Sequence, residues 1–295
     1  MATDLRQFVE QLAQLYRGAA AHSADLETRP ELEGHDMPEV QPGAPTAVVF
    51  SPHPDDECLT GGWALRLRRE AGWRVVNVAV TLGSNPERRQ ERLEELKRAC
   101  AFLGFDLTLP GGKGLEKIQL QTRRDQPDYW TYAVNVIGSL LQELQPQLVF
   151  LPHTADNHGT HIGTHALVRH ALIRAKDSVR CFVAESEYWA PQEDPNLLVE
   201  LPTETVVQLV QALSLHHGEI ARNPYHLRMP GWLMDNVRRG GELLSGHGNT
   251  PPDMVYGILY HLRRWDGKTY HEPAEAPLFI DQAMEPDACL KQFAG

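Results

Sequence analysis

Cysteine is scarce in this sequence of 295 residues. There are four cysteines, and none of them form a CxxC pair: Cys58, Cys100, Cys181 and Cys289. Frameworks of several disulfides are typical of small secreted domains, so this composition argues against one. We therefore expect reduced thiols, as in a cytosolic protein.

Long apolar segments are also absent. No apolar run approaches the roughly 20 residues of a membrane-spanning helix. The first residues do not show the basic start and apolar core of a secretory signal peptide, because Asp4, Arg6 and Glu10 interrupt them. We expect a cytoplasmic protein without a membrane span.

Positive charge is in deficit. The chain has 28 Lys and Arg against 39 Asp and Glu, which gives a net charge of -11 at pH 7. Nucleic acids and anionic membranes attract proteins that present a basic face, so neither is expected as a partner. A neutral or cationic small molecule fits the charge better.

Internal repeats and low-complexity tracts are missing, and short apolar runs alternate with helical patterns instead. Strands are expected near residues 46–51, 74–81, 105–109, 147–152 and 179–185, and helices over 55–70, 86–103, 129–144 and 161–175. This alternation predicts an α/β fold, a Rossmann-like, mostly parallel sheet with helices on both faces. Ligands of such sheets bind at the C-terminal ends of the strands, and we expect the functional site there.

The region before the first strand has a different pattern. Apolar residues recur there at the spacing of an amphipathic helix over residues 3–22: Leu5, Phe8, Val9, Leu12, Leu15 and Tyr16. This helix is expected to pack on the domain or on a neighbouring subunit. Residues 29–45 are rich in Pro, Gly and Glu, as in a linker. We divide the chain into residues 1–44, a helix and linker, and residues 45–295, a single domain with an extended C-terminal region.

The first strand runs directly into a histidine and three consecutive carboxylates. Val48 to Phe50 form an apolar run, followed by His53 and then by Asp55, Asp56 and Glu57. If a helix starts at Pro54, His53 and Asp56 lie three positions apart and converge on one point, while Asp55 points elsewhere. This arrangement predicts two metal ligands and one free carboxylate.

A second strand, near residues 147–152, runs into several histidines. His158 and His161 have HxxH spacing, and His165 follows one turn later. Catalytic zinc sites use three protein ligands and leave one position open for water. His53, Asp56 and one histidine of this second group would complete that set.

Each motif also has a purely structural interpretation. Carboxylates are common in the first turn of a helix because they offset its dipole. In a chain with 14 histidines, the HxxH group could be a solvated helix face. The two motifs together are better explained as a shared site, because both follow apolar strands and together they supply a full ligand set.

The sequence HPDDE at 53–57, together with Asp156-x-His158-x-x-His161, resembles the LmbE-like, or PIG-L, family of zinc-dependent N-acetylglucosaminyl deacetylases. The resemblance extends to an Arg-x-x-Glu-Leu pattern starting at Arg92, and to roughly residues 45–250. It implies that His53, Asp56 and His161 bind Zn²⁺, with Fe²⁺ as another possible metal. Asp55 would be the general base, His158 an acid or oxyanion partner, and Arg92 a substrate-binding residue.

The same resemblance implies a hydrolase that removes the acetyl group from an N-acetylated amino sugar or its conjugate. It also implies a homo-oligomer, a trimer or hexamer. One position departs from the family pattern, since Thr160 occupies the place of an acidic residue before the last zinc histidine. The residue that orients His158 would then be missing, unless Asp156 replaces it.

Three alternatives remain at the level of the sequence. The same machinery could cleave a bulkier amide conjugate, or the protein could bind metal and carbohydrate without catalysis. A nucleotide-binding protein is disfavoured because three carboxylates would repel a phosphate at the first strand–helix turn. In the C-terminal third, a group of aromatic and polar residues could form a sugar-binding rim or simply belong to a packed tail: His216, His217, Tyr225, His226, Arg228 and Trp232.

Overall fold

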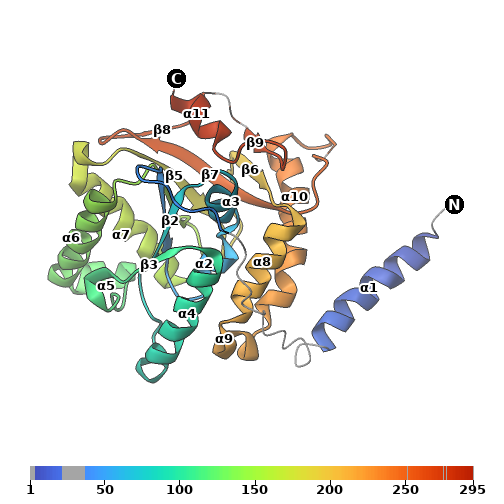
Figure 1. Ribbon diagram of the computed structural model, residues 1–295, viewed down its shortest axis with the longest axis horizontal. Helices are drawn as coiled ribbons and strands as arrows, with labels where there is room; N and C mark the ends of the chain where they lie inside the picture. Colours follow the sequence, from blue (N-terminus) through green and yellow to red (C-terminus); the bar gives the residue numbers. More distant parts are fainter. Residues whose placement is uncertain (1–3, 22–36, 251, 275, 277, 295) are drawn as a thin grey trace.

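The computed structural model describes residues 4–21, 37–250, 252–274, 276 and 278–294. Its centre is a nine-stranded sheet (Figure 1). The strand order is β3 (Asp106–Thr108), β2 (Arg74–Ala79), β1 (Thr46–Ser51), β4 (Leu148–Pro152), β5 (Cys181–Ser186), β7 (Gly257–Trp265), β6 (Leu197–Glu200) and β9 (Leu278–Ile280), with β8 (Tyr270–His271) paired to β7.

The strand directions explain where a site can form. Strands β3, β2, β1, β4 and β5 are parallel, whereas β7 runs antiparallel to β5 and to β6. The chain builds outward from β1 through β2 to β3, and then returns to the other side of β1 with β4. The order therefore reverses between β1 and β4, and the crevice outside the C-terminal ends of these two strands is where ligands bind in open sheets.

Helices cover both faces of the sheet, as predicted. One face packs against α3 (Gly62–Glu70), α4 (Arg89–Leu103) and α8 (Thr203–Ser214), and the other against α6 (Pro127–Leu144) and α7 (Gly159–Ala175). The two layers are seen on either side of the sheet in Figure 1. Alternate side chains of β1 serve opposite faces, so that Val49 belongs to the first core and Val48 and Phe50 to the second. Burial on both faces accounts for the continuous apolar run in the sequence.

The remaining helices are shorter or lie in the C-terminal region. They are α2 (Asp56–Leu59), α5 (Leu120–Asp125), α9 (His217–Arg222), α10 (Tyr225–Leu244) and α11 (Ala288–Ala294), with 3-10 turns at Pro86–Arg88, Pro110–Gly112 and Lys176–Ser178. Helix α10 packs against α8 and β7. No helix in the described ranges is long and apolar enough to cross a membrane.

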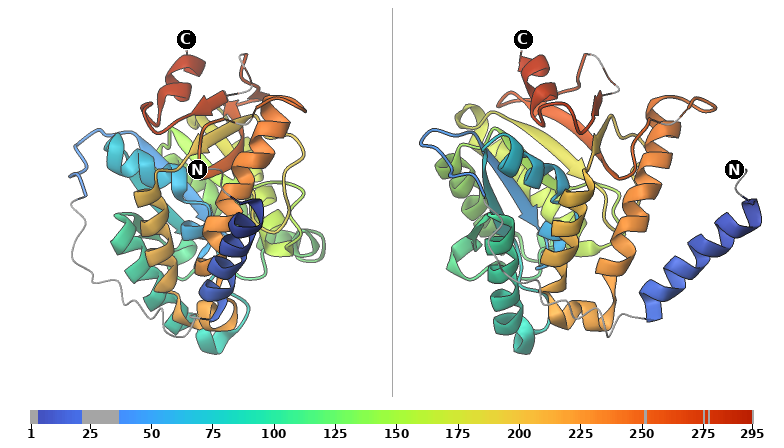
Figure 2. Two further views of the ribbon diagram at one scale, coloured as in Figure 1. Left: turned by 90° about the vertical axis from the view of Figure 1, so that its right-hand side faces the viewer. Right: turned by 45° about the vertical axis from the view of Figure 1, so that its right-hand side comes forward.

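The N-terminal helix α1 (Leu5–Ala21) forms as predicted, and it projects from the body in Figure 1 and in the right view of Figure 2. Its apolar side chains are exposed, for example Leu5 at 80% and Leu15 at 69%. Near Tyr16, whose hydroxyl lies against Gly231 of α10, this helix approaches the domain closely. Of the linker expected over residues 29–45, residues 29–36 lie outside the described residues.

Two sequence-based predictions of secondary structure were wrong. The helix expected over 55–70 is split into α2 and α3 at Thr60 and Gly61, and α2 begins at Asp56 rather than Pro54. The backbone of Asp55 adopts a left-handed conformation, φ 108°, which cannot continue a right-handed helix. The elements between residues 197 and 265 were largely left unassigned from the sequence, although they include the 12-residue helix α8 and the 20-residue helix α10.

Candidate active site

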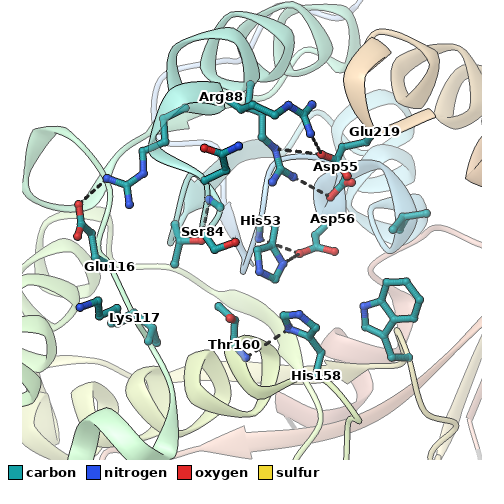
Figure 3. Close-up of a pocket in the computed structure, with 18 of the residues that line it drawn as sticks. His53, Asp55, Asp56, Ser84, Arg88, Glu116, Lys117, His158, Thr160 and Glu219 are labelled. Carbon is teal, nitrogen blue, oxygen red and sulfur yellow. Dashed lines mark hydrogen bonds and ion pairs between the residues drawn. The ribbon is translucent and has the colours of Figure 1, made fainter. Parts of the chain in front are cut away.

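A pocket of about 590 Å³ opens at the C-terminal ends of β1 and β4. Five of the six residues proposed for the site from the sequence line it: His53, Asp55, Asp56, Arg92 and His158. The sixth, His161, is fully buried directly behind them. Figure 3 shows His53 and Asp56 at the centre, with His158 facing them from the start of α7. The two distant motifs therefore meet in space.

Three side-chain atoms form a small triangle at the base of this pocket. His53 Nδ1 lies 3.3 Å from Asp56 Oδ2 and 3.3 Å from His161 Nε2, and His161 Nε2 lies 3.5 Å from Asp56 Oδ2. Ligand atoms about 2.0 to 2.2 Å from a tetrahedral centre lie about 3.3 to 3.6 Å from one another. The triangle therefore has the dimensions of three sites on a tetrahedral metal ion, and the nitrogen and oxygen donors suit zinc.

The charges around the triangle favour the ionised, metal-binding form of Asp56, but they also favour protonation of His161. Burial raises the pKa of Asp56, but His161 and a hydrogen bond from His53 outweigh it, so the pKa lies below its usual range. Burial lowers the pKa of His161, but Asp56 and Asp156 raise it overall. A carboxylate and two imidazoles held this closely in a buried place need a shared cation, either a proton or a metal ion.

A second group of potential ligands lies deeper in the protein. Glu57, Cys58 and His216 are fully buried, and their donor atoms are close enough to hold a metal ion. Here, however, Glu57 Oε1 already pairs with His216 Nε2 at 2.7 Å and accepts a hydrogen bond from Cys58 Sγ at 3.3 Å. Burial, and then Glu57, raise the pKa of Cys58 well above its usual range, so the thiol remains protonated. The pocket triangle is the better fit to a metal, since a protonated thiol is a poor ligand.

Asp55 stands beside the triangle without joining it. Burial, and then the neighbouring Asp56, raise the pKa of Asp55 well above its usual range, while Arg92 opposes the shift. The Arg92 guanidinium lies 4.0 Å from Asp55 Oδ1. The backbone φ of Asp55, 108°, is unusual for a residue with a side chain, and strained backbone of this kind is concentrated at functional sites.

His158 occupies the N-terminal cap of α7. Its ring Nδ1 accepts a hydrogen bond from the Thr160 N–H at 3.3 Å. An imidazole that accepts at Nδ1 carries its proton on Nε2 when it is neutral. Burial, followed by His53 and His161, lowers the pKa of His158, which favours that neutral form. His158 is thus set up as a hydrogen-bond donor at the pocket surface.

Asp156 has a different role from the one considered from the sequence. Its carboxylate accepts hydrogen bonds from the backbone N–H groups of His158, at 2.7 Å, and Trp189, at 3.0 Å. Its Oδ2 lies 3.7 Å from Nδ1 of His161. The interpretation that Asp156 replaces the missing acidic residue next to the His158 ring is therefore wrong. The carboxylate instead faces the far side of the His161 ring, whose other nitrogen belongs to the triangle.

The third histidine of the second motif is excluded from the site. His165 Nε2 lies 3.1 Å from Oε1 of Glu185, and its side chain lines a separate groove on α7. The reason is geometric: His165 follows His161 by four residues on α7 and therefore lies about one helical turn further from the pocket.

Several basic side chains line the same pocket: Arg88, Arg89, Arg92, Lys117 and Arg222. Arg88 and Arg89, which lie at the start of the helix that carries Arg92, line the pocket as well. Arg92 is partly committed to the protein, since its Nη2 donates to the Pro54 carbonyl at 2.8 Å. Acidic Glu219 lies 2.9 Å from Arg88 and 3.7 Å from Arg92, and so holds the two guanidinium groups in place.

Sequence reasoning missed some residues of the pocket. Glu219, Trp189, Lys117 and Gln119 line it, although none lies in a motif. Lys117 has a left-handed backbone conformation, φ 51°, which the sequence does not predict. The adjacent glycine-rich segment at 111–114 hinted only at a loop.

A family model described as PIG-L: GlcNAc-PI de-N-acetylase matches residues 48–172. This segment contains all six residues predicted for the site, and it confirms the resemblance seen in the sequence. A search of curated proteins gave no match.

Solved structures share the fold. An N,N'-diacetylchitobiose deacetylase from Pyrococcus horikoshii, complexed with its inhibitor MPG, is 17% identical, with a TM-score of 0.55 over 90% of this chain and 95% of that one. The A40926 pseudoaglycone deacetylase Dbv21 is 17% identical, with a TM-score of 0.54 over 73% and 96%. GalB, the 4-carboxy-2-hydroxymuconate hydratase from Pseudomonas putida KT2440, is also 17% identical, with a TM-score of 0.55 over 74% and 95%. Because a hydratase shares this fold, the fold alone does not fix the reaction.

Proposed function

We propose, from the premise that residues 48–172 of this chain form a PIG-L family domain, that the protein is a metal-dependent N-deacetylase of amino sugars. The observation that carries the proposal is the triangle of His53, Asp56 and His161, at the base of a pocket that also presents Asp55 and His158. The triangle is a set of metal ligands with one side open to the pocket. Asp55 adds a free carboxylate and His158 a hydrogen-bond donor, and these three parts together suffice to hydrolyse an amide.

His53, Asp56 and His161 would hold the ion, with Zn²⁺ favoured by the donors and Fe²⁺ as the alternative. Such an ion lowers the pKa of a water molecule and polarises the amide carbonyl. The rest of the chemistry belongs to the side chains of the chain itself.

Asp55 is placed to act as the general base. Its carboxylate lines the pocket next to the triangle and is excluded from it by the direction of the backbone. It would take a proton from the attacking water and return it to the leaving amine. Burial and Asp56 raise the pKa of Asp55, which strengthens it as a proton acceptor, and the Arg92 guanidinium, 4.0 Å away, opposes that rise and so favours the ionised form.

His158 is placed to stabilise the carbonyl oxygen. With Nδ1 occupied by the Thr160 N–H, its Nε2–H is the group left to donate. A donor aimed at the oxygen where negative charge develops contributes most in a pocket that excludes water. Arg92 would contact a hydroxyl of the sugar, using the guanidinium nitrogens not bound to Pro54.

The experiment is a panel of N-acyl amino sugars assayed for released amine, with the metal content of the same sample measured. Turnover that disappears in Asp55→Asn while the metal is retained supports the proposal and excludes a non-catalytic metal- and carbohydrate-binding protein. Turnover confined to larger amide conjugates would favour the bulkier-amide alternative. An absence of turnover across the panel in a fully metal-loaded sample would contradict both. Oligomeric state, expected as a trimer or hexamer, is measured separately by light scattering.

A further inference from the structure

A second, smaller cavity adjoins the catalytic pocket. Its volume is about 140 Å³, and we call it the apolar recess. The residues that line it are Leu59, Glu187, Tyr188, Trp189, Tyr225, Arg228, Met229 and Trp232. Leu59, Trp189 and Tyr225 also line the catalytic pocket, so the two spaces adjoin at these three side chains. A ligand held at the triangle can therefore extend into the recess.

Three segments far apart in the sequence build the recess. Helix α10 contributes Tyr225, Arg228, Met229 and Trp232, at the i, i+3, i+4, i+7 spacing of a single helix face. The segment after β5 contributes residues 187–189, and α2 contributes Leu59. The rings of Trp189 and Tyr225 meet edge to face with centroids 6.0 Å apart, at the boundary with the catalytic pocket.

Two of the polar side chains around the recess, Glu187 and Tyr188, are occupied by the protein itself, and the charged Arg228 lies at its exposed edge. The Glu187 carboxylate accepts two hydrogen bonds from Arg239, both at 2.7 Å, and another from the Gln192 N–H at 2.6 Å. The Tyr188 hydroxyl is paired with Thr60 Oγ1 at 2.9 Å. A second sugar ring would find few partners for its hydroxyls here, and an unpaired buried hydroxyl is costly. Aromatic and aliphatic walls instead favour an apolar group.

We propose that the apolar recess binds an apolar group of the substrate, so that the protein prefers amino sugars carrying a short alkyl or aryl substituent. This inference rests on the proposed deacetylase function. With about 30 Å³ for each water-sized unit, the recess holds roughly four or five carbons. The group is either an acyl chain longer than acetyl or an apolar aglycone, and both present the same surface. All lining residues except Leu59 lie outside residues 48–172, the segment matched by the family model.

The test compares two substrate series. In one, the acyl group of glucosamine is lengthened from acetyl to butanoyl and hexanoyl. In the other, N-acetylglucosamine carries a methyl, butyl or hexyl aglycone. If the recess is filled, kcat/KM rises about threefold to fourfold for each buried methylene in one series, and levels off after about four or five carbons. The series that rises identifies the source of the apolar group.

Trp232→Ala removes a wall of the recess without touching the catalytic pocket. We expect it to abolish the gain with chain length and to leave turnover of N-acetylglucosamine unchanged, while Trp232→Phe restores part of the gain. The matched control is Met234→Ala, on the same helix, with a side chain 45% exposed and outside the recess. Methyl and hexyl β-glucosides, which lack an amide, provide a binding measurement through tryptophan fluorescence that does not depend on activity.

The outcomes separate this inference from the proposed function. Hydrolysis of N-acetylglucosamine with flat chain-length profiles, and equal binding of methyl and hexyl glucosides, overturns the recess and leaves the deacetylase intact. A kcat/KM that rises with diacetylchitobiose and not with the alkyl series would show that the recess holds a sugar, and it would also overturn the proposal of an apolar group. Tighter binding of the hexyl glucoside that is lost in Trp232→Ala supports the recess even if no amide in the panel is hydrolysed, in which case only the proposed activity fails.

Discussion

The backbone N–H of Asp55 donates a hydrogen bond to Oε2 of Glu57 at 2.9 Å. The other oxygen of Glu57 is held by His216, 159 residues further along the chain, at 2.7 Å. The last member of the HPDDE motif thus connects the strained backbone of Asp55 to the junction of α8 and α9. A conformation that costs of order 1–3 kcal/mol persists only when its surroundings fix it.

Replacing Glu57 by Gln should therefore move Asp55 rather than the metal ligands. We expect kcat to fall about 10-fold to 100-fold, because small misplacements of a reacting group are costly, with KM and metal content unchanged. Steady-state kinetics and metal analysis measure this split. Cys58→Ser is the control, since the hydroxyl can still donate to Glu57. Equal losses in both variants, or a loss of stability alone, would contradict a positioning role.

Asp55→Asn should retain the metal and lose turnover by about 10²–10⁴-fold, because the amide cannot accept a proton. Single-turnover amine release and metal content are compared in the same preparation. Substantial residual activity would show that another group is the base.

His161→Ala should lose metal and activity together, as should His53→Ala. The affinity for Zn²⁺ is expected to fall by more than the roughly 10- to 100-fold typical of a change outside the ligand shell. Competition with a chelator gives the affinity. His165→Gln is the control, because His165 pairs with Glu185 away from the pocket. A full complement of zinc in His161→Ala would mean that the third ligand has been misassigned, and His158 would be tested next.

Asp156→Asn tests the carboxylate behind His161. Oxygen Oδ2 lies 3.7 Å from His161 Nδ1, and a carboxylate behind a ligating imidazole orients it and raises its basicity. We expect metal affinity to fall about 10- to 100-fold, with activity restored at high metal concentration. An unchanged affinity would show that the backbone contacts of Asp156 are its whole function.

The stability of the protein should depend on pH through His165. Burial, with Arg169 and Arg263 nearby, lowers the pKa of His165 to about 3. The unfolded chain, with an ordinary histidine pKa near 6.5, then binds more protons between these two values. The contribution of the neutral, buried His165 to the free energy of unfolding is complete above pH 6.5. It is lost as the pH falls, by at most about 1.4 kcal/mol per pH unit.

Denaturant titrations of the wild type and of His165→Gln between pH 7.5 and 4.5 isolate this contribution. The wild type should lose stability more steeply than the variant as the pH falls. Parallel curves would show that His165 takes up its proton in the folded state as readily as in the unfolded one.

The core fold and the candidate ligands could be predicted from the sequence because both are local. Apolar runs such as Val48 to Phe50 indicate buried parallel strands, and the alternation with helices fixes the sheet type. Motifs that directly follow strands of a parallel sheet must lie at the same edge, so His53 and His161 could be paired without coordinates. The left-handed backbone of Asp55, by contrast, is stabilised by His216 and Glu57, and no local pattern announces it.

The sequence by itself determined the α/β class, the five parallel strands, and the two motifs that supply nitrogen and oxygen ligands, because these follow from residue spacing and periodicity. Only the tertiary structure decided which side of His161 Asp156 faces, and that α10 joins the segment after β5 to form an apolar recess beside the pocket. The residues that line the recess lie up to 173 positions apart in the chain, as Leu59 and Trp232 do, and their arrangement depends on how whole helices pack rather than on any neighbour in the chain.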